Sequence, residues 1–235
     1  MKVYYIGDSW NSFPKLIENK LDYLQFHGAG LERIWEASVE KRKIADIVVF
    51  TIPGMVRSIQ FMNTERLESN DTKHWCNEFY LRFKDDSNFL DDFITYYFDL
   101  LKKYYQEQPN LVYFIYSTGG WPYKHPYNMS HHGVDNFQEQ MLSKWDESDM
   151  NYTYLDLTGE PDMCKDEEDA DDTIRERFAK RYYFDDLGWK LPPVYSDVDI
   201  FPPDKIVLDH HPSLKADEIA SKHIQKYLKK IEKNT

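Results

Sequence analysis

Cysteine is scarce in this sequence, and the two cysteines present are far apart. Cys76 and Cys164 are the only ones among 235 residues, and neither belongs to a Cys-x-x-Cys pair. Two cysteines are too few for the disulfide framework of a small secreted domain, and their spacing is not that of a zinc site. We therefore expect both to be reduced thiols without a chemical role.

Positive charge is also in short supply. The chain has 29 lysine and arginine residues against 41 aspartate and glutamate residues, which gives a formal net charge of -12. A surface of this sign repels a phosphate backbone. We therefore expect no nucleic-acid partner.

Long hydrophobic runs are absent as well. No stretch approaches the ~20 consecutive apolar residues that cross a bilayer. Residues 1–6 have the character of a strand and not of a charged leader followed by an apolar segment. The sequence therefore predicts a cytoplasmic protein with no membrane partner.

What the sequence does contain is an alternation of strand and helix patterns. β-rich or uninterrupted apolar runs predict strands at 2–6, 23–26, 45–51, 111–116 and 152–157. Helical periodicity predicts helices at 14–24, 31–39, 88–106, 134–145 and 214–231. The first of these helices would start at Pro14 and place Leu16, Ile17, Leu21 and Leu24 on one face.

This alternation predicts an α/β fold, namely a three-layer α/β/α sandwich with a mainly parallel, doubly wound, flavodoxin-like sheet. In such a fold the ligand cleft lies at the carboxyl ends of the strands. Residues 1–235 are few enough for a single domain. Polar or aromatic-rich segments at about 57–87, 117–133 and 159–203 interrupt the alternation and are predicted to be insertions.

A candidate nucleophile follows the first predicted strand. Gly7-Asp8-Ser9 lies where that strand turns sharply toward the next element, so the Ser9 hydroxyl is expected to face the cleft. A serine hydroxyl needs a base within hydrogen-bond reach, itself oriented by a carboxylate or a carbonyl. The segment after the first predicted strand is therefore expected to supply the nucleophile of a catalytic pair.

A candidate base lies near the other end of the chain. Residues 209–213 are predicted to form a turn between an extended stretch and the last helix, and they include Asp209, His210 and His211. In an α/β sandwich this turn can lie beside the carboxyl end of the first strand. The sequence therefore predicts that the two ends of the chain meet and that His211, oriented by Asp209, activates Ser9.

Together these motifs resemble those of the SGNH, or GDSL, hydrolase family. Residues 3–9 resemble its nucleophile block, and residues 28–30 resemble its second block, whose glycine N–H contributes to the oxyanion hole. Residues 45–50 with Pro53-Gly54 resemble the third block, and residues 211–213 with the following helix resemble the last. The resemblance implies a single SGNH-hydrolase-like domain that cleaves esters through a Ser-His-Asp triad and needs no cofactor.

The resemblance also implies a role for individual residues. Ser9 would be the nucleophile, His211 the base and Asp209 the orienting acid, with the N–H groups of Ser9 and Gly30 stabilising the oxyanion. Gly54, Asp8 and Arg57 are further candidates for oxyanion or substrate binding. The polar and aromatic insertions favour a small-molecule or glycan ester as substrate, such as an acetylated carbohydrate. The oligomeric state is left open.

Two departures from the family pattern mark a divergent member. Val56 stands where the family has an oxyanion-hole asparagine, two residues after Gly54, and Thr51, Arg57 or Asn11 are candidate replacements. Losing one such donor typically lowers turnover ~100 to 1000-fold. The second departure is the spacing of the acid. The family has its aspartate three residues before the histidine, where this chain has Leu208, and Asp209 stands only two residues before His211.

Other interpretations of the same residues stay open. His210, paired with Asp204 or a backbone carbonyl, is an alternative base. In a purely structural interpretation Asp8 or Ser12 caps a helix near the start, and Ser213 caps the last helix.

Two other functions also compete with the esterase. Residues 206–211 resemble the Asp-His-His motif of the metal-dependent DHH phosphoesterases. Alternatively, the fold could serve as a glycan- or protein-binding module. Histidines 125, 131 and 132 lie in one loop without a partner carboxylate at a recognisable spacing, so we expect hydrogen bonding there and no metal site.

Overall fold

The structure is a computed structural model that describes residues 1–8, 11–26, 29–53, 88–118, 137–157, 160, 163–165 and 209–233. Five parallel strands form its central sheet in the order β2-β1-β3-β4-β5. They are β1 (Val3–Gly7), β2 (Asp22–Gln25), β3 (Ile47–Thr51), β4 (Leu111–Thr118) and β5 (Tyr152–Leu157). This order is the flavodoxin-like one, in which the direction of winding reverses between β1 and β3. The predicted α/β fold is confirmed.

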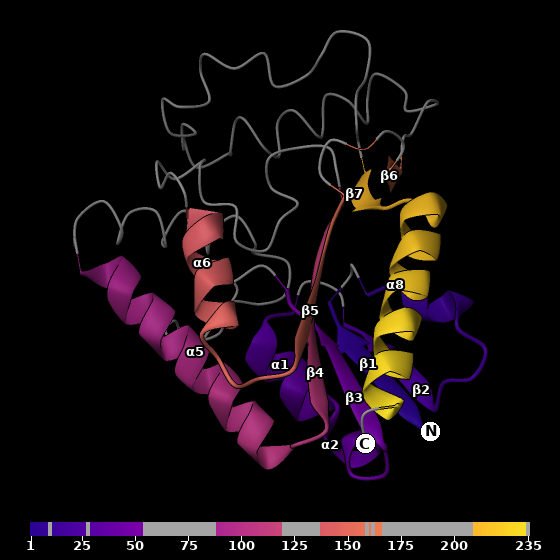
Figure 1. Cartoon of the computed structure of the whole chain (residues 1–235), viewed down its shortest axis with the longest axis horizontal. Coiled ribbons are helices and arrows are strands. Elements are labelled where there is room, and N and C mark those ends of the chain that lie inside the picture. Colours follow the sequence, from indigo (N-terminus) through magenta and orange to yellow (C-terminus); the bar gives the residue numbers. More distant parts are fainter. Residues whose placement is uncertain are drawn as a thin grey trace, which may run out of the picture.

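Helices cover both faces of this sheet (Figure 1). One layer holds α1 (Leu31–Ala37), α5 (Phe89–Glu107) and α6 (Phe137–Asp146), with the short α2 (Val39–Arg42) following α1. The other layer holds α8 (Leu214–Glu232) and the 3-10 helix η1 (Phe13–Leu16). The molecule is therefore a three-layer sandwich, as the alternation of patterns predicted.

The core is divided into two clusters because successive side chains of a strand point to opposite faces. In β3, Val48 and Phe50 pack in the cluster under α1, α5 and α6, whereas Ile47 and Val49 pack in the cluster under α8. All five residues of β3 are buried. Burial on both faces explains why this segment of the sequence is almost uninterruptedly apolar.

The predicted helix over 14–24 is wrong, whereas the strand predicted over 23–26 is confirmed as β2. The 3-10 helix ends at Leu16, which is exposed, and β2 follows and pairs with β1. Ile17 packs in the cluster under α8, whereas Leu21 and Leu24 pack against the cluster on the opposite face of the sheet. Side chains that the periodicity placed on one helical face thus serve two different cores, because pairing with β1 outweighs a local helical preference.

Most of the other predicted elements agree with the structure to within a few residues. The helix expected over 88–106 is α5, with Asn88 at its N-cap, and the helix expected over 214–231 is α8. Ser213 caps α8, since its hydroxyl accepts a hydrogen bond of 3.1 Å from the Ala216 N–H. This part of the purely structural interpretation is confirmed.

The segment predicted as a turn, 209–213, contains a strand instead. β7 (Asp209–Pro212) pairs in antiparallel fashion with β6 (Cys164–Lys165), outside the main sheet. The ladder is irregular at β6, where Cys164 is opposite Pro212, a residue with no N–H to donate. Two short segments so distant in sequence leave no periodic signal of their pairing, which is why the turn was expected.

The predicted insertions are described only in part. The segment 57–87 lies outside the described residues, β4 extends to Thr118 at the start of the second segment, and β6 belongs to the third. The division of the chain into one domain with three insertions stays a prediction. In the described ranges, none of the helices combines the length and the apolar character that crossing a membrane requires.

His223 of α8 packs against the sheet, and its titration is expected to make the free energy of unfolding depend on pH. Its ring stacks on Phe114 (centroids 5.8 Å apart), and its Nε2 is 2.8 Å from the Thr153 hydroxyl. Burial lowers the pKa of His223, and the positive charge of Lys226 lowers it further. The folded protein therefore favours the neutral ring more than the unfolded chain does.

The sign of this effect follows from proton linkage. Below a pH of about 6.5, the ordinary value for histidine, the unfolded chain takes up a proton that the folded protein resists, so the free energy of unfolding falls. We expect His223→Gln to lose less stability than the wild type in urea titrations between pH 7.5 and pH 5. Lys226→Gln should show an intermediate loss. Parallel pH profiles for wild type and His223→Gln would contradict this assignment.

Candidate functional site

The carboxyl end of β1 is packed closely against the segment that follows it. A methyl group built on Gly7 would stand 2.6 Å from Asn11 Cβ and 3.0 Å from Thr51 Cβ, so only glycine fits there. The Asn11 N–H donates to the Asp8 carbonyl at 3.1 Å. The carboxyl ends of β1 and β3 therefore meet at this point, beside Asp8.

Asn11 and Thr51 join the carboxyl ends of three neighbouring strands. The Thr51 hydroxyl donates to Asn11 Oδ1 at 2.8 Å, and Asn11 Nδ2 donates to the Leu24 carbonyl of β2 at 2.9 Å. Both side chains are buried, with exposed fractions of 1% for Thr51 and 0% for Asn11. Their hydrogen bonds hold β2, the segment after β1, and β3 together, and their part as replacement oxyanion donors stays a prediction.

The two ends of the chain meet, as predicted, and a hydrogen bond joins them. Ser12, at the N-cap of η1, donates its hydroxyl proton to Asp217 Oδ1 at 2.8 Å. Asp217 belongs to the first turn of α8 and is 9% exposed. Ser12 therefore does not cap a helix through its side chain, as the structural interpretation had it, but connects the segment after β1 to the start of α8.

The strand β7 lies at the same end of the molecule. Figure 1 shows it directly before α8, at the end of the molecule where β5 finishes. The Ser213 N–H donates to the Met163 carbonyl at 2.9 Å, and Met163 packs with α8 in the core. The backbone that carries Asp209 and His211 is thus placed at the carboxyl edge of the sheet, where doubly wound folds bind their ligands.

The structure describes the predicted site residues unequally. Asp8 is buried, with an exposed fraction of 3%, and the buried Gly30 is the N-cap of α1, where its carbonyl accepts from the Ile34 N–H at 3.2 Å. Asp209, His210 and His211 are placed through their backbone in β7. The remaining predicted residues lie outside the described ones: Ser9, Gly54, Val56 and Arg57.

Gly30 is brought to the same edge of the sheet as Asp8. Gly7 is in register with Gln25 of β2, and the Phe26 N–H donates to the Gly7 carbonyl at 2.9 Å. Gly30 follows shortly after and begins α1. The backbone around these two predicted residues therefore starts from neighbouring strand ends.

A metal site receives no support within the described residues. No group of three or more histidine, cysteine, aspartate or glutamate side chains there is placed to hold an ion. The loop histidines 125, 131 and 132 and Asp204 lie outside those residues. The DHH-type alternative is not tested by this part of the chain.

Sequence reasoning missed the residues that hold this edge together. Ser12 and Asp217 are 205 positions apart, so no local pattern relates them. Asn11 was considered only as an oxyanion donor. An asparagine four residues after the glycine that ends a strand is also a signal for a side chain that stabilises a turn. These residues support the site and do not belong to the predicted triad.

Comparison with known proteins identifies no relative. No protein-family model, no curated protein and no solved structure matches this chain. The likeness to SGNH hydrolases therefore rests on the sequence motifs alone and stays a prediction.

Proposed function

We propose that this protein is a serine hydrolase that cleaves an ester or acetyl group. The observation that supports this proposal best is the hydrogen bond between Ser12 and Asp217. Ser12 is three residues after Ser9, and Asp217 is six residues after His211. The hydrogen bond between Ser12 and Asp217 therefore supports a close approach of the two segments that carry the proposed nucleophile and base.

The proposed reaction uses the chain's own side chains. His211 takes the proton of the Ser9 hydroxyl while Ser9 Oγ attacks the carbonyl carbon, and Asp209 orients the imidazole. The N–H groups of Ser9 and Gly30 donate to the oxyanion. The alcohol leaves with the proton from His211, and water, deprotonated by the same histidine, then releases the acid and restores Ser9.

The substrate we propose is a carbohydrate or another small polar molecule that carries the ester. The sequence contains 18 tyrosines and 6 tryptophans, many of them in polar segments. Aromatic rings with a polar edge suit stacking on sugars and hydrogen bonding to hydroxyl groups. A long lipid chain would require an extended apolar surface instead.

Covalent labelling tests the identity of the nucleophile. A fluorophosphonate probe reacts with an activated serine, so we expect one adduct on the folded protein and expect peptide mass spectrometry to place it on Ser9. Ser143, an exposed serine of α6, serves as the internal control and should stay unmodified. An adduct on another residue, or none at a probe concentration that labels a known serine esterase, would refute the proposal.

A further inference from the structure

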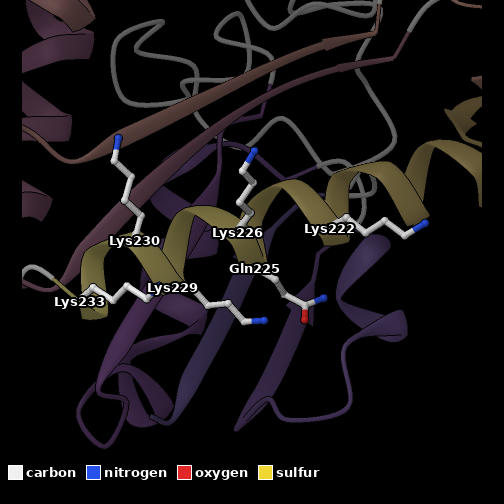
Figure 2. Close-up of a pocket in the computed structure, with 6 residues that line it drawn as sticks. All are labelled: Lys222, Gln225, Lys226, Lys229, Lys230 and Lys233. Atoms are coloured by element: carbon white, nitrogen blue, oxygen red, sulfur yellow. The ribbon is translucent and has the colours of Figure 1, made fainter.

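The outer face of α8 carries a row of lysines that the proposed hydrolase does not use. We call it the lysine stripe, and its members are Lys222, Lys226, Lys229, Lys230 and Lys233. All five side chains are exposed. Figure 2 shows them projecting from the helix together with Gln225, with Lys226 and Lys230 on one side of its axis and Lys229 on the other.

The position of the stripe follows from the helical period. Residues at spacings of three and four share a face, so the stripe lies opposite the apolar face of α8. That apolar face, which includes Ala220, Ile224 and Leu228, packs on the sheet. The fold therefore fixes the direction in which the lysines point, and between them and Gln225 they line an open groove of about 490 Å³.

Among the described residues, none forms an ion pair with a lysine of the stripe. In the described part of the chain, ion pairs are formed by Lys41 and Lys43 and not by any member of the stripe. Glu218 and Glu232 are on the same helix, but no ion pair joins either of them to a stripe lysine. In a chain with a formal net charge of -12, the stripe is a concentrated positive surface.

Helix stability does not account for the stripe. Cations near a helix C-terminus favour the macrodipole, but this effect is confined to the last turn, which explains Lys229 and Lys230 and not Lys222 or Lys226. Like charges four residues apart, such as Lys222 with Lys226 and Lys226 with Lys230, weakly destabilise a helix. The macrodipole therefore does not account for Lys222 and Lys226, the members of the stripe farthest from the helix C-terminus.

We propose that the lysine stripe binds an acidic segment of a partner protein. From Lys222 to Lys233 the stripe is about 16 Å long, at a rise of about 1.5 Å per residue. A short acidic peptide segment fits within this length and can contact the lysines alone. Its carboxylates would line up with the lysines across the groove, where Debye screening weakens repulsion from charges beyond about 10 Å.

Larger polyanions suit the stripe less well. A nucleic-acid duplex or a bilayer is much larger than the stripe, and the formal net charge of -12 on the chain as a whole repels a polyanion. The groove has no aromatic side chain for stacking bases and no arginine for bidentate phosphate binding. The apolar face of α8 is buried against the sheet, so the helix has no side to insert into a membrane.

A glutamate peptide of known length tests this binding. The probe is a fluorescein-labelled peptide of about six glutamates, long enough to span the stripe as an extended chain. We expect saturable binding by fluorescence anisotropy at about 0.1 M salt, where the screening length is about 10 Å. The triple variant Lys222→Gln, Lys226→Gln, Lys229→Gln should bind roughly tenfold more weakly, as the loss of three exposed ion pairs predicts.

A matched variant controls for overall charge. Lys102, Lys103 and Lys144 are exposed lysines of α5 and α6, on the other layer of the sandwich, and their replacement by glutamine removes the same charge. This control should bind the peptide like the wild type. Equal weakening in both triple variants, or no binding by the wild type, would overturn the proposal. So would stripe-dependent binding of duplex DNA or phosphatidylserine vesicles that is tighter than that of the peptide.

Discussion

Replacing Ser9 by alanine is expected to lower kcat for 4-nitrophenyl acetate by on the order of 10⁴- to 10⁶-fold, the range seen when a triad nucleophile is removed. Alanine has no hydroxyl to form the acyl-enzyme, so only the residual effect of binding and oxyanion stabilisation remains. The measurement is initial hydrolysis rate against substrate concentration, with circular dichroism and urea midpoints showing that the variant is folded. Wild-type turnover by Ser9→Ala would refute the proposed mechanism.

The histidine variants show whether the residues act as a unit. His211→Ala is expected to lose about as much turnover as Ser9→Ala, and the double variant should lose little more than either single one, since members of a triad are strongly non-additive. His210→Ala is the matched control, because His210 is the neighbouring residue of β7 and should retain most of the rate. If His210→Ala loses the activity and His211→Ala keeps it, His210 is the base.

Replacing Trp35 by alanine is expected to lower the free energy of unfolding by about 3 to 5 kcal/mol, the usual cost of removing a buried tryptophan ring. Trp35 is 5% exposed and stacks on Tyr104 of α5 with ring centroids 4.3 Å apart. The Arg42 guanidinium lies 3.4 Å from the centroid of the Trp35 ring, and Trp35 Nε1 donates a hydrogen bond to the Glu107 carboxylate at 3.0 Å. One side chain therefore connects α1, α2 and α5, and its loss leaves all three less firmly attached.

The size of this effect makes it measurable by urea denaturation. Small domains have total stabilities of about 5 to 15 kcal/mol, so Trp35→Ala should unfold at a much lower urea concentration and lose near-ultraviolet dichroism. Val39→Ala is the control, because Val39 is 41% exposed in the adjacent α2 and its truncation should change stability by no more than about 0.5 kcal/mol. A loss below about 1 kcal/mol for Trp35→Ala would contradict the packing described here.

Trp35→Phe separates ring packing from the polar contacts. Phenylalanine keeps an aromatic face for Tyr104 and Arg42 but has no N–H for Glu107. Burial lowers the pKa of Arg42, and the charge of Glu107 opposes this shift. We expect a loss of about 1 to 2 kcal/mol, in the range for one hydrogen bond to a charged group and a smaller ring.

The parts of the fold that could be predicted are those with a local period. The buried run of β3, the long amphipathic α5 and the lysine-ended α8 each repeat their pattern within a few residues, and each lies where it was expected. The Gly7-Asp8 turn was predictable for the same reason, since a β-rich run ends there. The prediction of an edge where both ends of the chain meet needed only the order of these elements and the rules of parallel sheets.

The parts that could not be predicted depend on contacts between distant segments. The helical period of residues 14–24 extends into the strand predicted over 23–26, and pairing with β1 decides that residues 22–25 form β2. The strand β7 forms because it pairs with β6. β6 consists only of Cys164 and Lys165, which are too few residues to show a strand periodicity in the sequence. In the candidate site the bond between Ser12 and Asp217 is of the same kind.

The α/β class, the succession of buried strands and amphipathic helices, and the motifs that make Ser9, Asp209 and His211 candidates can all be predicted from the amino-acid sequence. These follow from side-chain periodicity and backbone propensity, which act over a few residues. Only the tertiary structure decided that Asn11 and Thr51 support the strand ends and that Ser12 connects to α8 through Asp217. It also decided that five lysines line one groove on the outer face of α8. The physical reason is that hydrogen bonds and burial between remote segments are selected by packing of the whole chain.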